Sequence, residues 1–82
     1  MATSIGEFEL KVMKRVALHG GRASLVSPGA ARIGEEILDG EDGARVVSAL
    51  LKLESAEYLE RQGDAFALTE QGTEYLDLLG LA

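Results

Sequence analysis

The most constraining feature of this chain is the segment 57–69, which reads EYLERQGDAFALT. Short runs of apolar and β-prone residues flank Gln62-Gly63-Asp64, and glycine at such a position favours a tight turn. Directly afterwards, Thr69 suits the N-cap of a helix, and Glu70 lies in its first turn, where the helix dipole favours a negative charge. The pattern predicts a β-hairpin followed by a last helix over 70–80. Because an isolated hairpin is only marginally stable, it requires a further strand or a helix to pack on.

A strand that can pair with this hairpin is predicted early in the chain. The residues RASLV at 22–26 form a short, partly β-prone run that follows a first helix predicted over 5–19. That helix has a capping-box pattern in Ser4 and Glu7, and Gly20 and Gly21 end it. Its apolar face is made by residues at helical spacing: Ile5, Phe8, Val12 and Val16. We therefore expect a small three-stranded sheet that covers the helices.

Two further helices are predicted between the early strand and the hairpin. The segment 28–38 follows Ser27, a suitable N-cap, and begins with Pro28, which suits the first helical position. The residues DGEDG at 39–43 predict a turn, and another helix follows over 43–54. The apolar faces of these two helices are Ala30, Ile33, Gly34 and Ile37 in the first, and Val46, Ala49, Leu50 and Leu53 in the second. The expected order is α-β-α-α-β-β-α, a mainly α fold with a small β-sheet (α+β), in a single domain over 1–82.

The helix predicted over 43–54 also has a narrow polar stripe. Arg45, Ser48 and Lys52 recur at i, i+3 and i+7, which places them on one side of the helix. A short glycine-containing turn precedes this helix, as in a helix-turn-helix. The hairpin that follows would then be a wing beside it.

Residues 49–76, ALLKLESAEYLERQGDAFALTEQGTEYL, resemble the winged helix-turn-helix of bacterial transcription regulators of the MarR and PadR types. The likeness is most specific in Leu68-Thr69-Glu70 followed by Gly72, which is similar to the LTE-x-G after the wing in that family. The resemblance implies a transcriptional regulator that inserts helix 43–54 into the major groove of double-stranded DNA. The contacts implied are Arg45, Ser48 and Lys52 from the helix, and Arg61 from the wing.

The resemblance also implies a homodimer formed through the terminal helices, as in regulators that read two-fold sites. Both terminal helices have apolar positions beside their predicted core faces: Leu10, Met13 and Ala17 in the first, and Leu78 with Leu81 just beyond in the last. Scattered surface apolar residues are the simpler explanation for the same positions.

The balance of charge favours a different function. The chain has 8 Lys and Arg against 14 Asp and Glu, and its net charge is −6. Between residues 22 and 68, five basic residues are opposed by nine acidic ones, and Glu41 and Asp42 precede the helix that would approach phosphates. The alternative is an acidic winged-helix module for protein–protein interaction or assembly that does not bind DNA. The sequence leaves both functions open.

Other chemistries find little support in the sequence. The chain has no Cys, and its one His, His19, has no second soft ligand beside it, so we expect no metal site. A calcium loop at DGEDG is rejected because Leu50 stands where the bidentate Glu belongs. No phosphate-loop spacing or nucleophile–base pair is present, so we expect neither an enzyme nor a cofactor. No signal peptide is recognisable and no run approaches the roughly 20 apolar residues of a membrane span, which predicts a cytoplasmic protein.

The apolar faces of the expected helices and strands together predict the core. Its members are Phe8, Val12, Val16, Ile33, Ile37, Val46, Leu50, Leu53, Leu59, Phe66, Leu68, Tyr75, Leu76 and Leu79.

Overall fold

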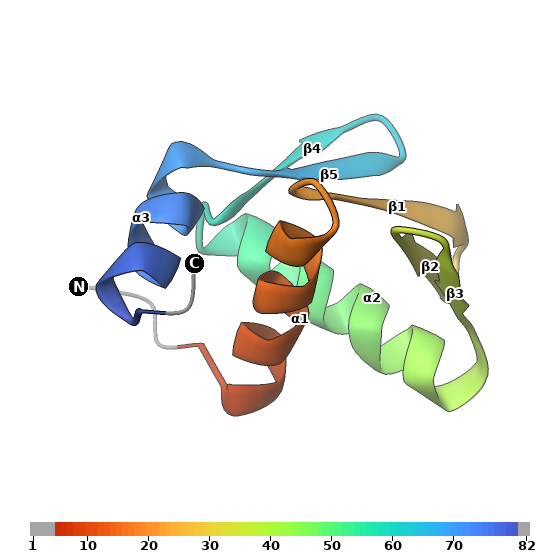
Figure 1. Ribbon diagram of the computed structural model, residues 1–82. Coiled ribbons are helices and arrows are strands. Elements are labelled where there is room, and N and C mark those ends of the chain that lie inside the picture. The colour runs from red at the N-terminus through yellow and green to blue at the C-terminus, as the bar shows by residue number, and fades with distance from the viewer. Residues whose placement is uncertain (1–4, 81–82) are drawn as a thin grey trace.

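The computed structural model describes residues 5–80, and in them three helices pack with a five-stranded antiparallel sheet (Figure 1). The order along the chain is α1 (Glu7–Leu18), β1 (Arg22–Ser27), β2 (Ala30–Ile33), β3 (Glu36–Leu38), α2 (Gly40–Ser55), β4 (Leu59–Gln62), β5 (Ala65–Leu68) and α3 (Glu70–Leu78). The fold is α+β, but the predicted winged helix-turn-helix is wrong. The order is α-β-β-β-α-β-β-α, so one helix instead of two lies between β1 and β4.

The segment predicted as a helix over 28–38 forms β2 and β3. Pro28 and Gly29 make the turn between β1 and β2, and Gly34 turns the chain towards β3 with a φ of 64°, a conformation that favours glycine. Ala31 and Ile33 are buried, whereas Arg32 between them is exposed. This alternation is that of a strand, but in the sequence it is too short to outweigh the helical spacing of Ala30, Ile33 and Ile37.

The predicted hairpin over 57–69 is confirmed. β4 and β5 pair antiparallel, with Leu59 opposite Leu68 and Gln62 opposite Ala65, across a turn in which Gly63 has a φ of 65°. The predicted pairing of the early strand with this hairpin is also confirmed, because β1 pairs with β5. β1 pairs with β2 on its other side, so the strand order is β3-β2-β1-β5-β4. The central strand therefore lies between two hairpins instead of beside one.

The hairpin β4–β5 is fastened at both ends. Where α2 ends, Glu57 has a φ of 68°, and the Tyr58 N–H donates to the Leu53 carbonyl (2.9 Å) in the pattern of a Schellman cap. Where α3 begins, Thr69 is the N-cap, as predicted, and its hydroxyl accepts a hydrogen bond from the Gly72 N–H (3.0 Å). The same hydroxyl donates to the Glu57 carbonyl (2.7 Å), which ties the two helix ends together.

The other helix starts differ from the prediction. α2 begins at Gly40, after Asp39 as N-cap, so residues 40–43 are helical and not the predicted turn. The first helix is confirmed, but its N-cap is Gly6, whose N–H donates to a Glu9 carboxylate oxygen (3.3 Å). Ser4, predicted for this role, lies outside the described residues.

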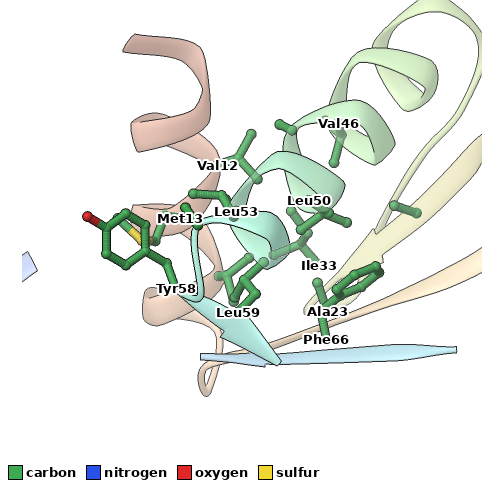
Figure 2. Close-up of a cluster of buried hydrophobic side chains, with 14 of the residues drawn as sticks. Val12, Met13, Ala23, Ile33, Val46, Leu50, Leu53, Tyr58, Leu59 and Phe66 are labelled. Carbon is green, nitrogen blue, oxygen red and sulfur yellow. The ribbon is translucent and has the colours of Figure 1, made fainter. Parts of the chain in front are cut away.

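The core lies between the helices and one face of the sheet. Figure 2 shows side chains from α1, α2, β1, β2, β4 and β5 meeting there. The predicted core residues that are buried are Val12, Val16, Ile33, Val46, Leu50, Leu53, Leu59, Phe66 and Leu76. Phe8, Leu68 and Tyr75 are partly buried against them. The prediction is wrong for Ile37 and Leu79, which are 47% and 44% exposed, because Ile37 faces the same side of the sheet as the exposed Arg32 and Leu79 follows the end of α3.

The opposite face of the sheet has no helix over it within the described residues (Figure 1). A row of residues in register crosses all five strands on this face: Ile37, Arg32, Ser24, Ala65 and Gln62. The next row contains Arg22, Ala67 and Glu60. Ser24 and Ala65 in the first row and Ala67 in the second are small, so this open face is shallow along β5 and the middle of β1, beside the arginine side chains of Arg22 on β1 and Arg32 on β2.

Candidate functional site

Three of the four residues predicted to contact DNA lie together in the structure. Arg45, Ser48 and Lys52 are exposed on one side of α2 and line a pocket of about 350 Å³ with Phe8 and Glu9 of α1. The Arg45 guanidinium carbon lies 4.4 Å from the centre of the Phe8 ring, and the Lys52 ammonium lies 3.9 Å from a Glu9 carboxylate oxygen. Both cations therefore already have partners within the domain.

The fourth residue, Arg61, lies on a different element. It is on β4, where its Nε donates to the Gly63 carbonyl (3.1 Å) and its guanidinium carbon lies 5.5 Å from the centre of the Phe66 ring. Arg61 thus braces its own hairpin and does not line the pocket of Arg45, Ser48 and Lys52.

A second basic group, which the sequence did not reveal, lies on the open face of the sheet. His19, Arg22 and Arg32 line a pocket of about 310 Å³, which we call the sheet pocket. Small residues complete its lining: Ala23, Ser24, Gly34 and Ala65. No acidic residue lines it, and the ion pairs found within residues 5–80, Arg15–Glu36 and Lys52–Glu9, leave both of its arginines unpaired there.

Strand register brings the two arginines of the sheet pocket onto one face. Ser24 lies opposite Arg32 in the pairing of β1 with β2, and Arg22 precedes Ser24 by two residues. Residues two apart in a strand point to the same face, so both guanidinium groups are displayed on the open side. Their side chains are exposed and extend beyond the small side chain of Ser24.

His19 reaches the same pocket from the end of α1. It is the C-cap of that helix, and Gly20 and Gly21, both at positive φ, then reverse the chain into β1. The imidazole packs directly on Gly34, because a Cβ at that glycine would lie 2.5 Å from His19 Nδ1. Gly34 therefore serves both as the turn residue of β2–β3 and as the platform for this ring.

Charge is divided unevenly along the chain. Residues 5–32 contain five of the eight Lys and Arg but two of the fourteen Asp and Glu, and residues 33–80 contain the others. The basic part comprises α1, β1 and nearly all of β2, and these elements supply every basic residue of the sheet pocket. The pocket is thus a local basic site on an acidic protein.

The aromatic residues of the described chain are engaged elsewhere. Phe66 is fully buried and Phe8 lies beneath Arg45. Tyr58 stacks on Tyr75, with ring centres 4.8 Å apart. The sheet pocket is therefore lined by none of the Phe and Tyr rings of the described residues, and His19, Arg22 and Arg32 supply its basic groups.

The surface proposed from the sequence for dimerisation is only partly available. Met13 is fully buried in the core, whereas Leu10 and Ala17 are partly buried against it. Leu78 is 86% exposed, and Leu81 lies outside the described residues. Within residues 5–80, the terminal helices therefore leave one prominent apolar side chain at the predicted positions.

Two further properties concern the described part of the chain. Its His, Asp and Glu side chains form no group of three that is arranged to hold a metal ion. None of its helices has the length and apolar character needed to cross a membrane.

No protein-family model, curated protein or solved structure matches this chain. The likeness to winged-helix regulators therefore remains a resemblance of residues 49–76. The sheet pocket had one signal in the sequence: reading 22–26 and 30–33 both as strands places Arg22, Ser24 and Arg32 on outward positions. Predicting a helix over 28–38 obscured that signal.

Proposed function

We propose that this chain is a protein-binding module that holds an acidic, extended segment of a partner protein on the open face of its sheet. The observation that carries the proposal is the sheet pocket, in which His19, Arg22 and Arg32 gather without an acidic neighbour in the lining. The chain as a whole is strongly acidic, so this local excess of basic groups stands out.

The chemistry of the pocket supports a carboxylate ligand. An arginine guanidinium presents a planar fork of donors that matches the two oxygens of a carboxylate. Arg22 and Arg32 are held on neighbouring strands, so two such forks face one ligand. The small side chains of Ser24 and Ala65 beside them let an extended backbone approach the sheet closely.

DNA binding through α2 is the competing function, and one observation supports it: Arg45, Ser48 and Lys52 share one exposed side of that helix. Two features make it the weaker candidate. The helix expected before α2 does not exist, so the support that a helix-turn-helix gives its recognition helix is missing. In addition, Lys52 is paired with Glu9, and Glu41 and Asp42 occupy the first turn of α2.

A titration followed by NMR on uniformly ¹⁵N-labelled protein tests the proposal. The probe is a short synthetic peptide of alternating Asp and Val. An Asn–Val peptide is the uncharged control, and a pool of random DNA duplexes, titrated separately, tests for DNA binding. We expect the acidic peptide to shift the amides of Arg22, Ser24 and Arg32, and the other two probes to leave them in place.

Matched double variants locate the binding surface. Arg22→Gln with Arg32→Gln should weaken peptide binding on the order of fivefold, because exposed ion pairs contribute about 0.2–1 kcal/mol each. Arg45→Gln with Lys52→Gln removes the same charge from α2 and should change the affinity less than twofold. The sheet pocket would be contradicted as the site if both double variants lost peptide affinity equally, or if the amide signals that the peptide shifts were centred on α2. Duplexes that bind through Arg45 and Lys52 while the peptide does not bind would favour the DNA function.

A further inference from the structure

A pocket distinct from the sheet pocket opens on the helical side of the molecule. It lies between α1, the first turns of α2, and strands β2 and β3, and encloses about 300 Å³. Its interior is made by apolar side chains from all four elements: Phe8, Val12, Ile33, Leu38 and Val46. Figure 2 shows Val12, Ile33 and Val46 approaching from α1, β2 and α2. We call it the helix pocket.

The helix pocket has charged groups at its mouth. Lys11 and Arg15 reach it from α1, and Asp42 reaches it from α2. Arg15 is paired with the carboxylate of Glu36 on β3, which holds its guanidinium beside the pocket. Lys11 is exposed and takes part in neither of the ion pairs found within residues 5–80. On the α1 side of the mouth, Arg15 is therefore held in an ion pair, whereas the Lys11 ammonium can bind a ligand.

The geometry points to the helix pocket as a binding site for a small organic acid that joins a single carboxylate to an apolar body about the size of one aromatic side chain. An apolar interior with a few polar groups at its mouth is the usual construction of small-molecule sites, and its volume lies at the lower end of their range. The apolar body would fill the space among Val12, Ile33 and Val46. The carboxylate would meet the Lys11 ammonium beside Arg15.

The charges at the mouth select the sign of the ligand. Arg15 is compensated by Glu36, so Lys11 is the cation that favours an anion at the α1 side of the opening, away from Asp42 on α2. A second negative charge on the ligand would approach Asp42, so a monocarboxylate fits better than a dicarboxylate. This site does not depend on the sheet pocket, which shares none of its lining residues.

The test uses the full chain with ¹³C-labelled methyl groups and 3-phenylpropionate as the probe. We expect millimolar probe to shift the methyl signals of Val12, Ile33, Leu38 and Val46, which line the pocket. Phenethylamine has the same ring with the opposite charge and should bind at least fivefold more weakly. Acetate has the carboxylate without the ring and should not shift these methyl signals.

A matched pair of lysine variants tests the role of the mouth. Lys11→Gln should weaken 3-phenylpropionate binding about three- to fivefold, because it removes an exposed ammonium from the carboxylate. Lys14→Gln removes the same charge from the same helix at an exposed residue outside the pocket lining, so its effect should stay below twofold. The assignment is overturned if the methyl groups do not respond, if the amine binds as well as the acid, or if both variants weaken binding equally.

Discussion

The two hairpins on either side of β1 have the same place in the fold but very different signals in the sequence. β4–β5 and β2–β3 each add two antiparallel strands to the central strand, and each buries large apolar side chains under the sheet. The first was predicted with its turn and the helix that follows it. The second was predicted as a helix. The difference shows how far local signals decide a fold of this size.

Local chemistry specifies β4–β5 almost completely. Its turn contains Gly63 at a φ of 65°, and Thr69 marks where the strand ends and α3 begins. β2–β3 has strands of four and three residues, and the helical spacing of Ala30, Ile33 and Ile37 competes with the strand alternation of Ala31 and Ile33. What selects the strand is pairing with β1, a contact made only when the chain has folded.

The largest expected effects come from emptying the core beneath each hairpin. Phe66→Ala under β4–β5 should lower the free energy of unfolding by about 3–5 kcal/mol, and Ile33→Ala under β2–β3 by about 2–5 kcal/mol, because both side chains are essentially fully buried. Urea denaturation followed by circular dichroism measures both losses.

Hydrogen exchange measured on the same two variants tests whether the two hairpins belong to one cooperative unit. If they do, both core variants raise exchange throughout the sheet. If Ile33→Ala accelerates exchange in 30–38 alone and leaves β4–β5 protected, β2–β3 is a separate, less stable unit, and the equivalence of the two hairpins fails.

An intermediate effect is expected at the glycine where a helix meets each hairpin. A Cβ on Gly43 would lie 2.5 Å from the carbonyl oxygens of Gly29 and Leu38, and a Cβ on Gly72 would lie 2.4 Å from the Tyr58 carbonyl oxygen. Each change to Ala should therefore destabilise by about 1–3 kcal/mol through overpacking, partly offset by the better helix propensity of Ala, worth about 1 kcal/mol.

Thermal unfolding of the two glycine variants measures this effect. Gln71→Ala, at an exposed residue beside Gly72, is the control and should change stability by less than about 0.5 kcal/mol. A stabilising Gly43→Ala beside a destabilising Gly72→Ala would mean that β2–β3 can move away from α2 more easily than β4–β5 can move away from α3.

The smallest effects are expected at the helix caps. Thr69→Ala removes hydrogen bonds with Gly72 and Glu57 and should destabilise by about 0.5–2 kcal/mol, whereas Thr69→Ser should be close to neutral. Asp39, the cap after β2–β3, makes no side-chain capping bond, so Asp39→Ala should lose only a favourable dipole interaction of about 0.3–1 kcal/mol. Chemical denaturation measures the free energy of unfolding of both variants. If Asp39→Ala lowers it as much as Thr69→Ala does, the two caps do not distinguish the hairpins.

Sequence patterns predicted the parts of the fold in which local signals agree. Helix 5–19, the strand at 22–26, the hairpin and the last helix are all present, because caps, turns and periodicity point the same way in each. The fold class was still wrong in its arrangement. One segment of about ten residues was predicted as a helix and forms a hairpin instead, because its apolar spacing satisfies both structures. The predicted pair of helices is therefore a hairpin followed by one helix.

The candidate sites were harder to predict than the fold. Helical periodicity correctly placed Arg45, Ser48 and Lys52 on one side of α2, but it gave no sign that Phe8 and Glu9 of α1 would engage Arg45 and Lys52. His19, Arg22 and Arg32 are brought together by strand register and by the reversal after α1. Such a group is visible only once β2 is known to be a strand.

The uneven division of charge also bears on how other molecules reach this protein. In physiological salt the Debye length is about 8 Å, so the repulsion from a net charge of −6 acts on an approaching anion only near the surface. There it acts on more segments of a long polyanion than of a compact acidic group. For a ligand of the sheet pocket, the division of charge would therefore make successful encounters depend on the size of an anion and not only on its sign.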